Sequence, residues 1–386
     1  MGGLEVAIKM HSRHGGGSFS AMAAMFFFQT FTIGLDLYVI APLLPAIGKS
    51  LHVHTVGLSS LVSSFSWAYA IASPLLGYIL DRMTRRSMAI MGLSAFLVGD
   101  TLSAAAPGYA VLFAGRVLTG LGAAGFTPAL YAYLADRIPV GDRGTMMGYA
   151  SAGFASATFL GVPIGLLIAG SSDWRRPLWL VVALGLCSMA MTLLAWQPFK
   201  KSHGISTGKL PSAFFLNIGV TAAAFTGFSI VYTFLAAHLR VRFHASAAGI
   251  ASVMSVFGLG GLLGTILWGS AADRWPPWHV IRRGILFEVL CLGLTPFAHQ
   301  MATAALLWGG FALGAAYTPV LKSLASQFKP RGSALAWNNA AIYLGLAMGA
   351  QIAGLAWPWG WTTIIATGAS ALLLALGISW LAHSAI

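Results

Sequence analysis

Apolar stretches long enough to cross a lipid bilayer fill almost the whole of this 386-residue chain. A membrane-spanning helix needs about 20 consecutive, mostly apolar residues. Only 8% of the residues are charged, against about 25% in an ordinary soluble protein. Because a water-facing surface needs more charge than this to stay soluble, the sequence predicts an all-α protein surrounded by lipid.

Twelve spanning helices fit the sequence, with breaks at proline, glycine or clusters of charge. They are expected at residues 22–48, 57–80, 86–106, 109–134, 144–170, 177–197, 211–238, 246–272, 280–298, 302–326, 332–357 and 360–382. The only sizeable polar break is Lys200–Leu210. We therefore expect an N-terminal six-helix bundle (1–199), a cytoplasmic linker (200–210) and a C-terminal six-helix bundle (211–386).

Basic residues are distributed unevenly around these spans. With both termini in the cytoplasm, sixteen of the 22 Lys and Arg residues fall on the inner side, five on the outer side, and Arg116 within a helix. This bias fixes the orientation by the positive-inside rule. It also accounts for the net charge of +13, which therefore does not indicate nucleic-acid binding. We expect a monomeric integral protein of a prokaryotic inner (plasma) membrane, in contact with the lipid bilayer.

A short motif occurs at the ends of the second and eighth spans. Gly77–Arg82 and Gly269–Arg274 both read Gly-x-x-x-Asp-Arg, 192 residues apart. Two further echoes, at Pro128 and Pro319 and at Arg143 and Arg331, have offsets of 191 and 188 residues. Such a repeat predicts two six-helix halves related by an axis along the membrane normal, with a binding site between them.

The run Gly77–Arg86 resembles the loop signature between helices two and three of the major facilitator superfamily, and the resemblance extends over nearly the whole chain. It implies the twelve-helix fold of that family and a charge latch that holds one conformation closed. The second copy departs from the pattern at Trp275–Trp278. The alternative is a set of interfacial charges with no gating role. The candidate latch residues are Gly77, Asp81, Arg82, Arg85, Arg86, Arg143, Asp273, Arg274 and Arg331.

Helix five carries a small residue at every fourth position, which favours close helix crossing, and a proline that predicts a kink. Gly161–Gly165, followed by Trp174 and Arg175, resembles the helix-five signature of the antiporter branches, although Val162 interrupts the usual Gly-Pro pair. The alternative is that these small residues only allow close helix packing. The candidate residues of the helix-five motif are Gly153, Gly161, Pro163 and Gly165. Gly120–Gly125 spells a dinucleotide-binding pattern but lies in an apolar helix, so we expect it to serve packing.

Four ionisable residues lie within the expected spans, where charge is costly and therefore indicates function. Asp36 and Arg116 are expected at similar depths, and both resemble positions of drug:proton antiporters: the helix-one acid and the helix-four arginine linked to proton coupling. A static ion pair is the alternative. We expect Asp100 near the outer end of helix three, within reach of water. Glu288 is expected to pair with Arg282 or Arg283, or to extend toward the inner surface.

The first expectation for function is a proton-coupled antiporter that exports small amphipathic or drug-like molecules. An uptake symporter or a sugar or metabolite exporter on the same fold is the alternative, and a transport-dead sensor or membrane enzyme is a remote one. The histidines are scattered, so we expect no enzyme, metal or cofactor, and a proton gradient as the energy source. Candidate cavity residues are Gln29, Tyr38, Tyr131, Asn217, Tyr232, Tyr317, Asn338, Asn339 and Tyr343.

Overall fold

The computed structural model describes residues 16–80, 83–170, 173–198, 210–328 and 331–384, and these residues are helical with short connections. The first half contains α2 (Gly16–Leu51), α3 (Thr55–Leu80), α4 (Arg85–Ala104), α5 (Tyr109–Arg137), α6 (Val140–Ser156), the π-helix η1 (Ala157–Gly161), α7 (Val162–Ala169) and α8 (Arg175–Ala195). The second contains α9 (Ser212–Phe243), α10 (Ala247–Ala272), α11 (Pro277–Leu294), η2 (Thr295–Phe297), α12 (Met301–Ala315), α13 (Thr318–Gln327), α14 (Arg331–Ala356), η3 (Trp357–Trp359) and α15 (Trp361–Ser384).

Two of the expected spans are broken into separate helices. In the fifth, Val162 donates to the carbonyl of Ala157, a wide π turn directly before Pro163. Because proline has no N–H for the regular ladder, the turn accommodates it without ending the span. In the tenth, the helix stops at Ala315 and restarts at Thr318, with Pro319 in the first turn of α13. Counting α6–η1–α7 and α12–α13 as one span each, the described residues form twelve helical spans.

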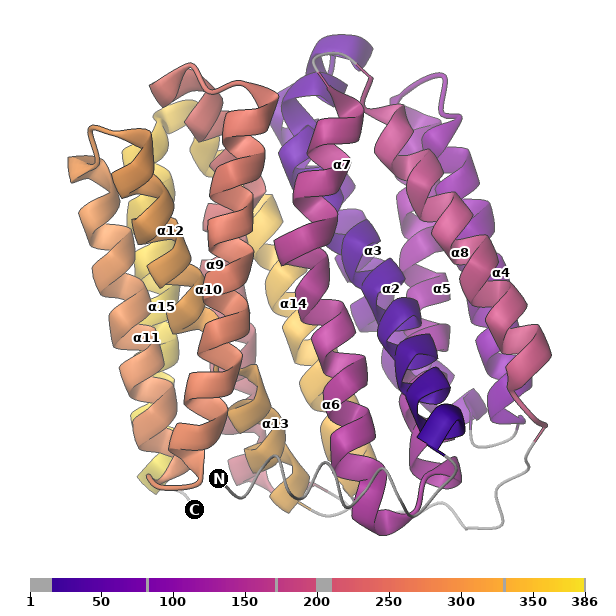
Figure 1. Ribbon diagram of the computed structural model, residues 1–386. Helices are drawn as coiled ribbons and strands as arrows, with labels where there is room; N and C mark the ends of the chain where they lie inside the picture. Colours follow the sequence, from indigo (N-terminus) through magenta and orange to yellow (C-terminus); the bar gives the residue numbers. More distant parts are fainter. Residues whose placement is uncertain (1–15, 81–82, 171–172, 199–209, 329–330, 385–386) are drawn as a thin grey trace.

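Length and composition alone qualify ten of the described helical segments as membrane spans. The second and ninth expected spans, α3 and α11, fall outside that set. α3 is rich in serine, and α11 carries Arg282, Arg283 and Glu288 within 18 residues. Each of the two helices nevertheless runs alongside the other helices of its own bundle (Figure 1).

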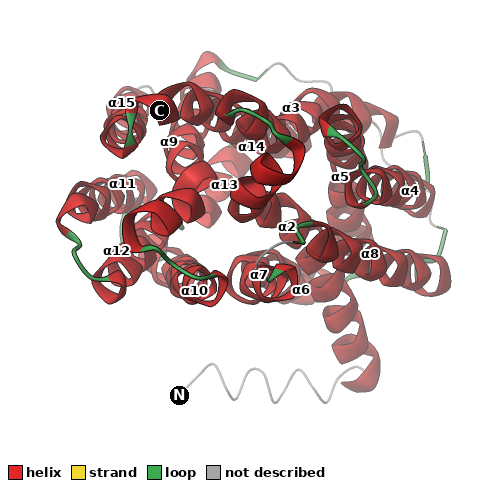
Figure 2. Ribbon diagram, turned by 90° about the horizontal axis from the view of Figure 1, so that it is seen from above, coloured by secondary structure: helices red, strands yellow, loops and turns green. Residues whose placement is uncertain are grey.

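The helices form two bundles, visible side by side from above (Figure 2). α2 to α8 make one and α9 to α15 the other, and α2 begins on the same side on which α15 ends (Figure 1). We call that the terminal side and the opposite one the far side. The bundles meet where α3 packs on α14, η1 and α7 pack on α10, and α2 packs on α9. All but the last residue of the expected linker, 200–210, lies outside the described part of the chain.

Glycine sets how closely neighbouring helices approach. A methyl group added at Gly122 of α5 would lie 2.6 Å from the Gly92 carbonyl oxygen and 2.7 Å from the Phe96 Cα of α4. Gly120, two residues earlier, faces the backbone of Phe65 on α3 instead. The dinucleotide-like run Gly120–Gly125 is thus buried between helices, consistent with its expected use in packing.

We predict that Gly122→Ala lowers the stability of the purified protein by about 1–3 kcal/mol, because the added methyl overpacks the α4–α5 contact. Thermal unfolding in detergent, followed by tryptophan fluorescence, measures this. Gly377→Ala on α15 is the matched control, since nothing lies within 4 Å of its added methyl. That variant should unfold at the wild-type temperature or slightly above it, because alanine favours helix. Equal effects at the two positions would contradict the packing role.

Candidate functional site

Three buried charged side chains from three helices meet inside the N-terminal bundle. Arg116 of α5 donates from Nη1 to Asp36 Oδ1 on α2, and the same nitrogen lies 3.8 Å from Asp100 Oδ1 on α4. Their side chains are at most 1% exposed. We call Asp36, Asp100 and Arg116 the charge triad. The structure therefore brings together the two residues expected to act in proton coupling.

The charge triad is only partly satisfied by hydrogen bonds. Asp36 Oδ2, Asp100 Oδ2 and Arg116 Nε have no hydrogen-bond partner among the described residues. Asp100 Oδ1 lies 3.4 Å from the Thr119 hydroxyl, and the Phe65 ring centroid lies 5.0 Å from Arg116 Cζ. With both carboxylates ionised, the group carries one net negative charge that has no counter-charge. Buried charge of this kind is costly, and one bound proton would neutralise it.

Asp100 differs from its expected environment. It lies near the far end of α4, as expected, but it is fully buried and out of reach of water. The reason is the close crossing of α4 and α5: a methyl group on Gly99 would lie 2.5 Å from Thr119 N, and one on Gly115 would lie 2.7 Å from the Gly99 carbonyl. Each glycine is the immediate neighbour of a triad residue. Two glycines beside two opposite charges were the sequence signal for this arrangement.

A cavity of about 290 Å³ lies between the two bundles. It is closer to the terminal side than the contacts that join the bundles on the far side, which are described below. Most of its wall is aromatic or aliphatic, with scattered hydroxyl groups, and it includes Glu288 and Lys322. Its volume is at the lower end of the range for small-molecule sites. The lining residues include Tyr38, Tyr69, Thr127, Tyr131, Ser151, Phe154, Thr158, Phe225, Phe228, Phe257, Thr265, Glu288, Tyr317, Lys322, Asn339, Ile342 and Tyr343.

Five of the nine cavity residues expected from the sequence line this space, namely Tyr38, Tyr131, Tyr317, Asn339 and Tyr343. The other four are buried elsewhere. Gln29 donates from Nε2 to the Thr192 hydroxyl at 3.0 Å, which joins α2 to α8. Asn338 and Asn217 lie between α14 and α9, where Asn338 Oδ1 accepts from Thr221 at 3.0 Å. Tyr232 contacts Tyr38 on the far side of the cavity, as described next.

Aromatic side chains from both halves close the far side of the cavity. The Tyr232 hydroxyl on α9 donates to the carbonyl oxygen of Tyr38 on α2 at 3.0 Å. The rings of Tyr69 on α3 and Tyr343 on α14 are stacked with centroids 3.5 Å apart. Each pair joins one bundle to the other.

Further contacts between the halves lie at η1 and toward the far ends of α3 and α14. Gln351 Nε2 on α14 donates to the Ser63 hydroxyl on α3 at 2.8 Å. A methyl group on Gly258 of α10 would lie 2.6 Å from the Thr158 carbonyl carbon in η1, and one on Gly354 of α14 would lie 2.8 Å from Ser59 Cβ. The lining residues Ser151, Lys322 and Asn339 lie toward the terminal ends of their spans. The contacts between the halves are therefore concentrated on the far side of the cavity.

Glu288 also differs from its expected environment. It is fully buried on the cavity wall, and its Oε2 accepts from the Tyr317 hydroxyl at 3.4 Å. Arg282, one of its two expected partners, instead donates to the Ser379 hydroxyl at 3.1 Å and to the Ser379 carbonyl. A methyl group on Gly314 of α12 would lie 2.7 Å from the Glu288 backbone nitrogen, so close packing turns this side chain inward.

The candidate latch is only partly described. Asp81 and Arg82 lie outside the described residues, and neither the surroundings of Gly77 nor the side chain of Arg331 are described. Arg85 pairs with Asp136 at the terminal end of α5, with Nε and Oδ2 3.1 Å apart, while Arg86 donates to the Leu193 carbonyl at 2.7 Å. Arg143 donates to the Ile138 carbonyl at 2.8 Å, and Asp273 and Arg274 are exposed. The gating role stays a prediction.

The helix-five motif packs against α2. Methyl groups on Gly161 and Gly165 would lie 2.9 Å from Leu35 Cδ1 and Val39 Cγ2, and Gly153 faces the Phe27 carbonyl. Gly34 of α2 faces η1 in turn, with its added methyl 2.9 Å from Ala157 Cβ. The stripe therefore holds Asp36's helix against the π turn, which is also a contact to the other half.

A contact path joins the charge triad to the cavity. Arg116 lies over Phe65, whose ring centroid is 6.5 Å from that of Tyr69 and 6.2 Å from that of Tyr343. A second connection runs along α2, since Asp36 is two residues from Tyr38. These contacts link the triad to side chains that join the halves.

We predict that Arg116→Met destabilises the protein by about 3–5 kcal/mol, because it leaves two buried carboxylates without a counter-charge. The double variant Arg116→Met/Asp36→Asn should regain part of that loss in thermal unfolding, since one of the orphaned charges is gone. Arg176→Met is the control: its pair with Asp173 is largely exposed and contributes at most about 1 kcal/mol. Additive effects of the two triad substitutions would contradict the pairing.

Comparison with known proteins gives the family of the chain. The Major Facilitator Superfamily profile matches residues 26–220 and 218–385, one match for each half. The uncharacterized MFS-type transporter YceJ of Bacillus subtilis is 26% identical over 92% of this chain and 94% of its own. Multidrug resistance protein 1 of the same organism is 25% identical, over 90% and 92%.

Among solved structures, a D-xylose-proton symporter matches 92% of this chain and 97% of its own with a TM-score of 0.76 and 16% identity, a likeness of fold alone. These relatives are transporters and not enzymes. The expected all-helical fold of two six-helix bundles is confirmed. The chain is an integral membrane transporter that belongs to the Major Facilitator Superfamily.

Proposed function

We propose that this protein is a proton-coupled antiporter that exports small amphipathic or drug-like molecules by alternating access. The observation that carries the proposal is the charge triad, which holds two carboxylates and one arginine in a dry site. Its net charge changes between minus one and zero when it gains one proton. A buried group whose charge balance needs a proton is suited to proton coupling.

The proton would act by changing the strength of contacts within the triad. With both carboxylates ionised, Arg116 holds α2 and α4 to α5 by charge-assisted contacts. A proton on Asp36 or Asp100 weakens one of those contacts, because a neutral acid attracts the guanidinium less strongly. Tyr38, two residues after Asp36 on α2, makes a contact to the other half. Protonation would thereby favour or disfavour separation of the halves on the far side.

The chemistry of the cavity supports an amphipathic cargo. Aromatic rings of Phe228, Phe257, Tyr69 and Tyr343 supply apolar contact area, while hydroxyl groups such as that of Thr158 offer hydrogen bonds. Wide apolar walls with few polar groups accept molecules by shape and hydrophobicity. The name of the relative Multidrug resistance protein 1 agrees with this class of cargo. An uptake symporter is the second candidate, because the interrupted helix-five motif leaves the direction open.

Topology and assembly belong to the same proposal. We place the terminal side in the cytoplasm, because the excess of Lys and Arg expected on that side follows the positive-inside rule. The cavity then lies toward the cytoplasm, where an exporter collects its cargo. We propose a monomer in a prokaryotic inner membrane, which moves its cargo with the proton gradient and without a cofactor.

We predict that Asp36→Asn abolishes uptake of cargo into inside-acidic proteoliposomes, because the amide cannot take up or release a proton. Binding of the same cargo to the detergent-purified variant should remain within a factor of about three of wild type, since Asp36 does not line the cavity. Asp173→Asn, at an exposed loop carboxylate, is the control and should transport normally. Proton-driven uptake that survives Asp36→Asn would refute the coupling role.

A second prediction tests alternating access. In a background with Cys187→Ser and Cys291→Ala, the pair Ser63→Cys/Gln351→Cys should cross-link on oxidation and stop transport, because it ties the far side shut. Reductant should restore the flux. The pair Thr221→Cys/Asn338→Cys, which joins α9 to α14 within one half, is the control and should leave transport active when cross-linked. Unchanged flux after cross-linking of the first pair would contradict movement at this contact.

A further inference from the structure

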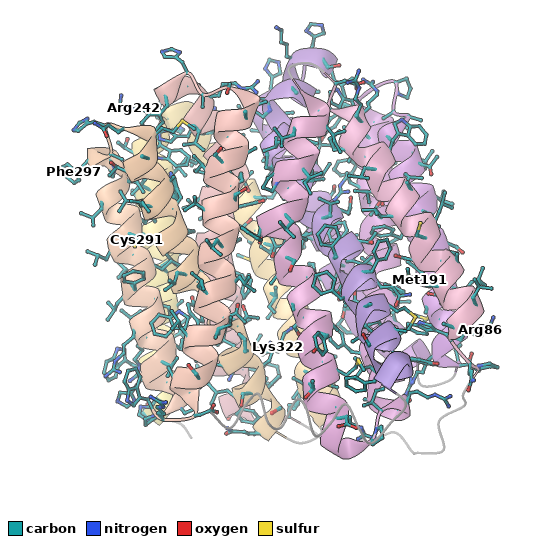
Figure 3. All side chains as sticks on the ribbon, viewed as in Figure 1. Arg86, Met191, Arg242, Cys291, Phe297 and Lys322 are labelled. Carbon is teal, nitrogen blue, oxygen red and sulfur yellow. The ribbon has the colours of Figure 1, made fainter. Side chains whose placement is uncertain are left out.

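Two charged side chains lie on the cavity wall, far from the charge triad and both in the C-terminal half. Glu288 projects from α11 and Lys322 from α13, the short helix after the break in the tenth span. Figure 3 shows Lys322 in the lower part of the view, near α13 and α6, and Cys291, one turn after Glu288, higher on α11. The two charges therefore stand at different heights along the cavity.

Neither charge is neutralised within the described residues. Glu288 is fully buried, and its Oε1 has no hydrogen-bond partner there. Its other oxygen has only the long 3.4 Å contact with the Tyr317 hydroxyl. Lys322 forms no ion pair or hydrogen bond with the described side chains, including that of Glu288. Unpaired charges within a membrane protein are costly and mark a place for a ligand or ion.

The separation of the charges follows from their positions in the chain. Tyr317 contacts Glu288, and Lys322 follows five residues later, about 7 Å further along the helix axis. The cavity wall also presents aromatic rings, among them Phe228 and Tyr343. The cavity thus holds an acid and a base at different heights on a largely aromatic and aliphatic wall.

We infer that the cargo is amphoteric: a molecule with an aromatic or aliphatic body, a protonated amine at one end and a carboxylate at the other. The amine binds Glu288 and the Tyr317 hydroxyl, the carboxylate binds Lys322, and the body packs against the rings. This inference deepens the proposed function, on which it rests, by naming the class of cargo.

Electrostatic balance favours this class over simpler ones. A molecule that carries only a cation neutralises Glu288 but leaves the Lys322 ammonium unpaired and adds a like charge to the same cavity. A purely anionic molecule neutralises Lys322 but leaves the Glu288 carboxylate unpaired and adds a like charge to the same cavity. A neutral molecule displaces water from both charges and supplies no partner for either, which costs binding energy.

A matched set of four probes tests the inference in the wild-type protein. They are 4-(aminomethyl)benzoate, its methyl ester, its N-acetyl derivative and the neutral compound with both modifications. Binding is measured by isothermal titration calorimetry on detergent-purified protein at pH 7 without a proton gradient. We expect the amphoteric probe to bind about tenfold or more tightly than either singly charged probe. Equal or tighter binding of the neutral probe would overturn the inference.

Single substitutions then assign each charge to its end of the probe. Glu288→Gln should weaken the amphoteric and cationic probes about tenfold and leave the anionic probe unchanged. Lys322→Gln should weaken the amphoteric and anionic probes and leave the cationic probe unchanged. Asp173→Asn and Lys49→Met remove one charge of each sign outside the cavity, at a partly exposed and an exposed position, and should bind all probes as wild type does. Equal losses for every probe would indicate a structural role for the variant residue and contradict the assignment.

Failure of this inference can be told apart from failure of the proposed function. Binding preference is measured at equilibrium and needs neither a proton gradient nor Asp36. If the probes bind with the expected order while Asp36→Asn still supports proton-driven uptake, the cargo class stands and the coupling site is wrong. If Asp36→Asn abolishes uptake while the neutral probe binds best, the coupling site stands and the amphoteric cargo is refuted.

Discussion

The ion pairing of Arg116 with Asp36 and Asp100 is the interaction on which the N-terminal bundle depends most. Three charges inside a membrane bundle persist only if each finds an opposite partner. Arg116 serves two carboxylates from two different helices, so α2, α4 and α5 are all tied to one guanidinium. A structure that needed only stability would be served by one acid, because one acid and one arginine already balance. The second acid leaves the site with a net negative charge that one bound proton can neutralise.

Close helix packing makes that arrangement possible. Gly99 and Gly115 bring α4 and α5 near enough for Asp100 to face Arg116, and Gly34 and Gly161 hold α2 against the π turn of helix five. The same device recurs in the second half, where methyl groups on Gly345 and Gly349 would lie 2.8 Å from Phe225 Cβ and 2.6 Å from Ser229 Cβ of α9. Glycine therefore fixes the rotation of each helix about its axis, and that rotation decides which side chains face the cavity.

The rotation of each helix about its axis is also the feature that the sequence alone does not predict. Apolar length and charge distribution suffice for twelve spans, the two halves and the depth of Asp36 and Arg116. They do not say which way a residue points, so Asn217 and Asn338 were expected in the cavity but lie between α9 and α14. Glu288 was expected to meet an arginine of its own helix, because its sequence neighbourhood does not show which helix packs beside it. The Gly314 contact that turns it inward joins two different helices.

Comparison of equivalent positions in the internal repeat shows that the two halves carry different functional groups. The position 192 residues after Arg116 is Trp308, which is buried with its ring edge-on to those of Phe311 and Trp361, centroids 5.9 Å away in each case. Phe311 stacks on Phe228, which lines the cavity. One half thus places a charged side chain where the other places an aromatic one, which packs behind the cavity wall. Two copies of one six-helix unit with different groups at equivalent positions can hold a proton in one half and a cargo's charged ends in the other, while the contacts between the halves couple them.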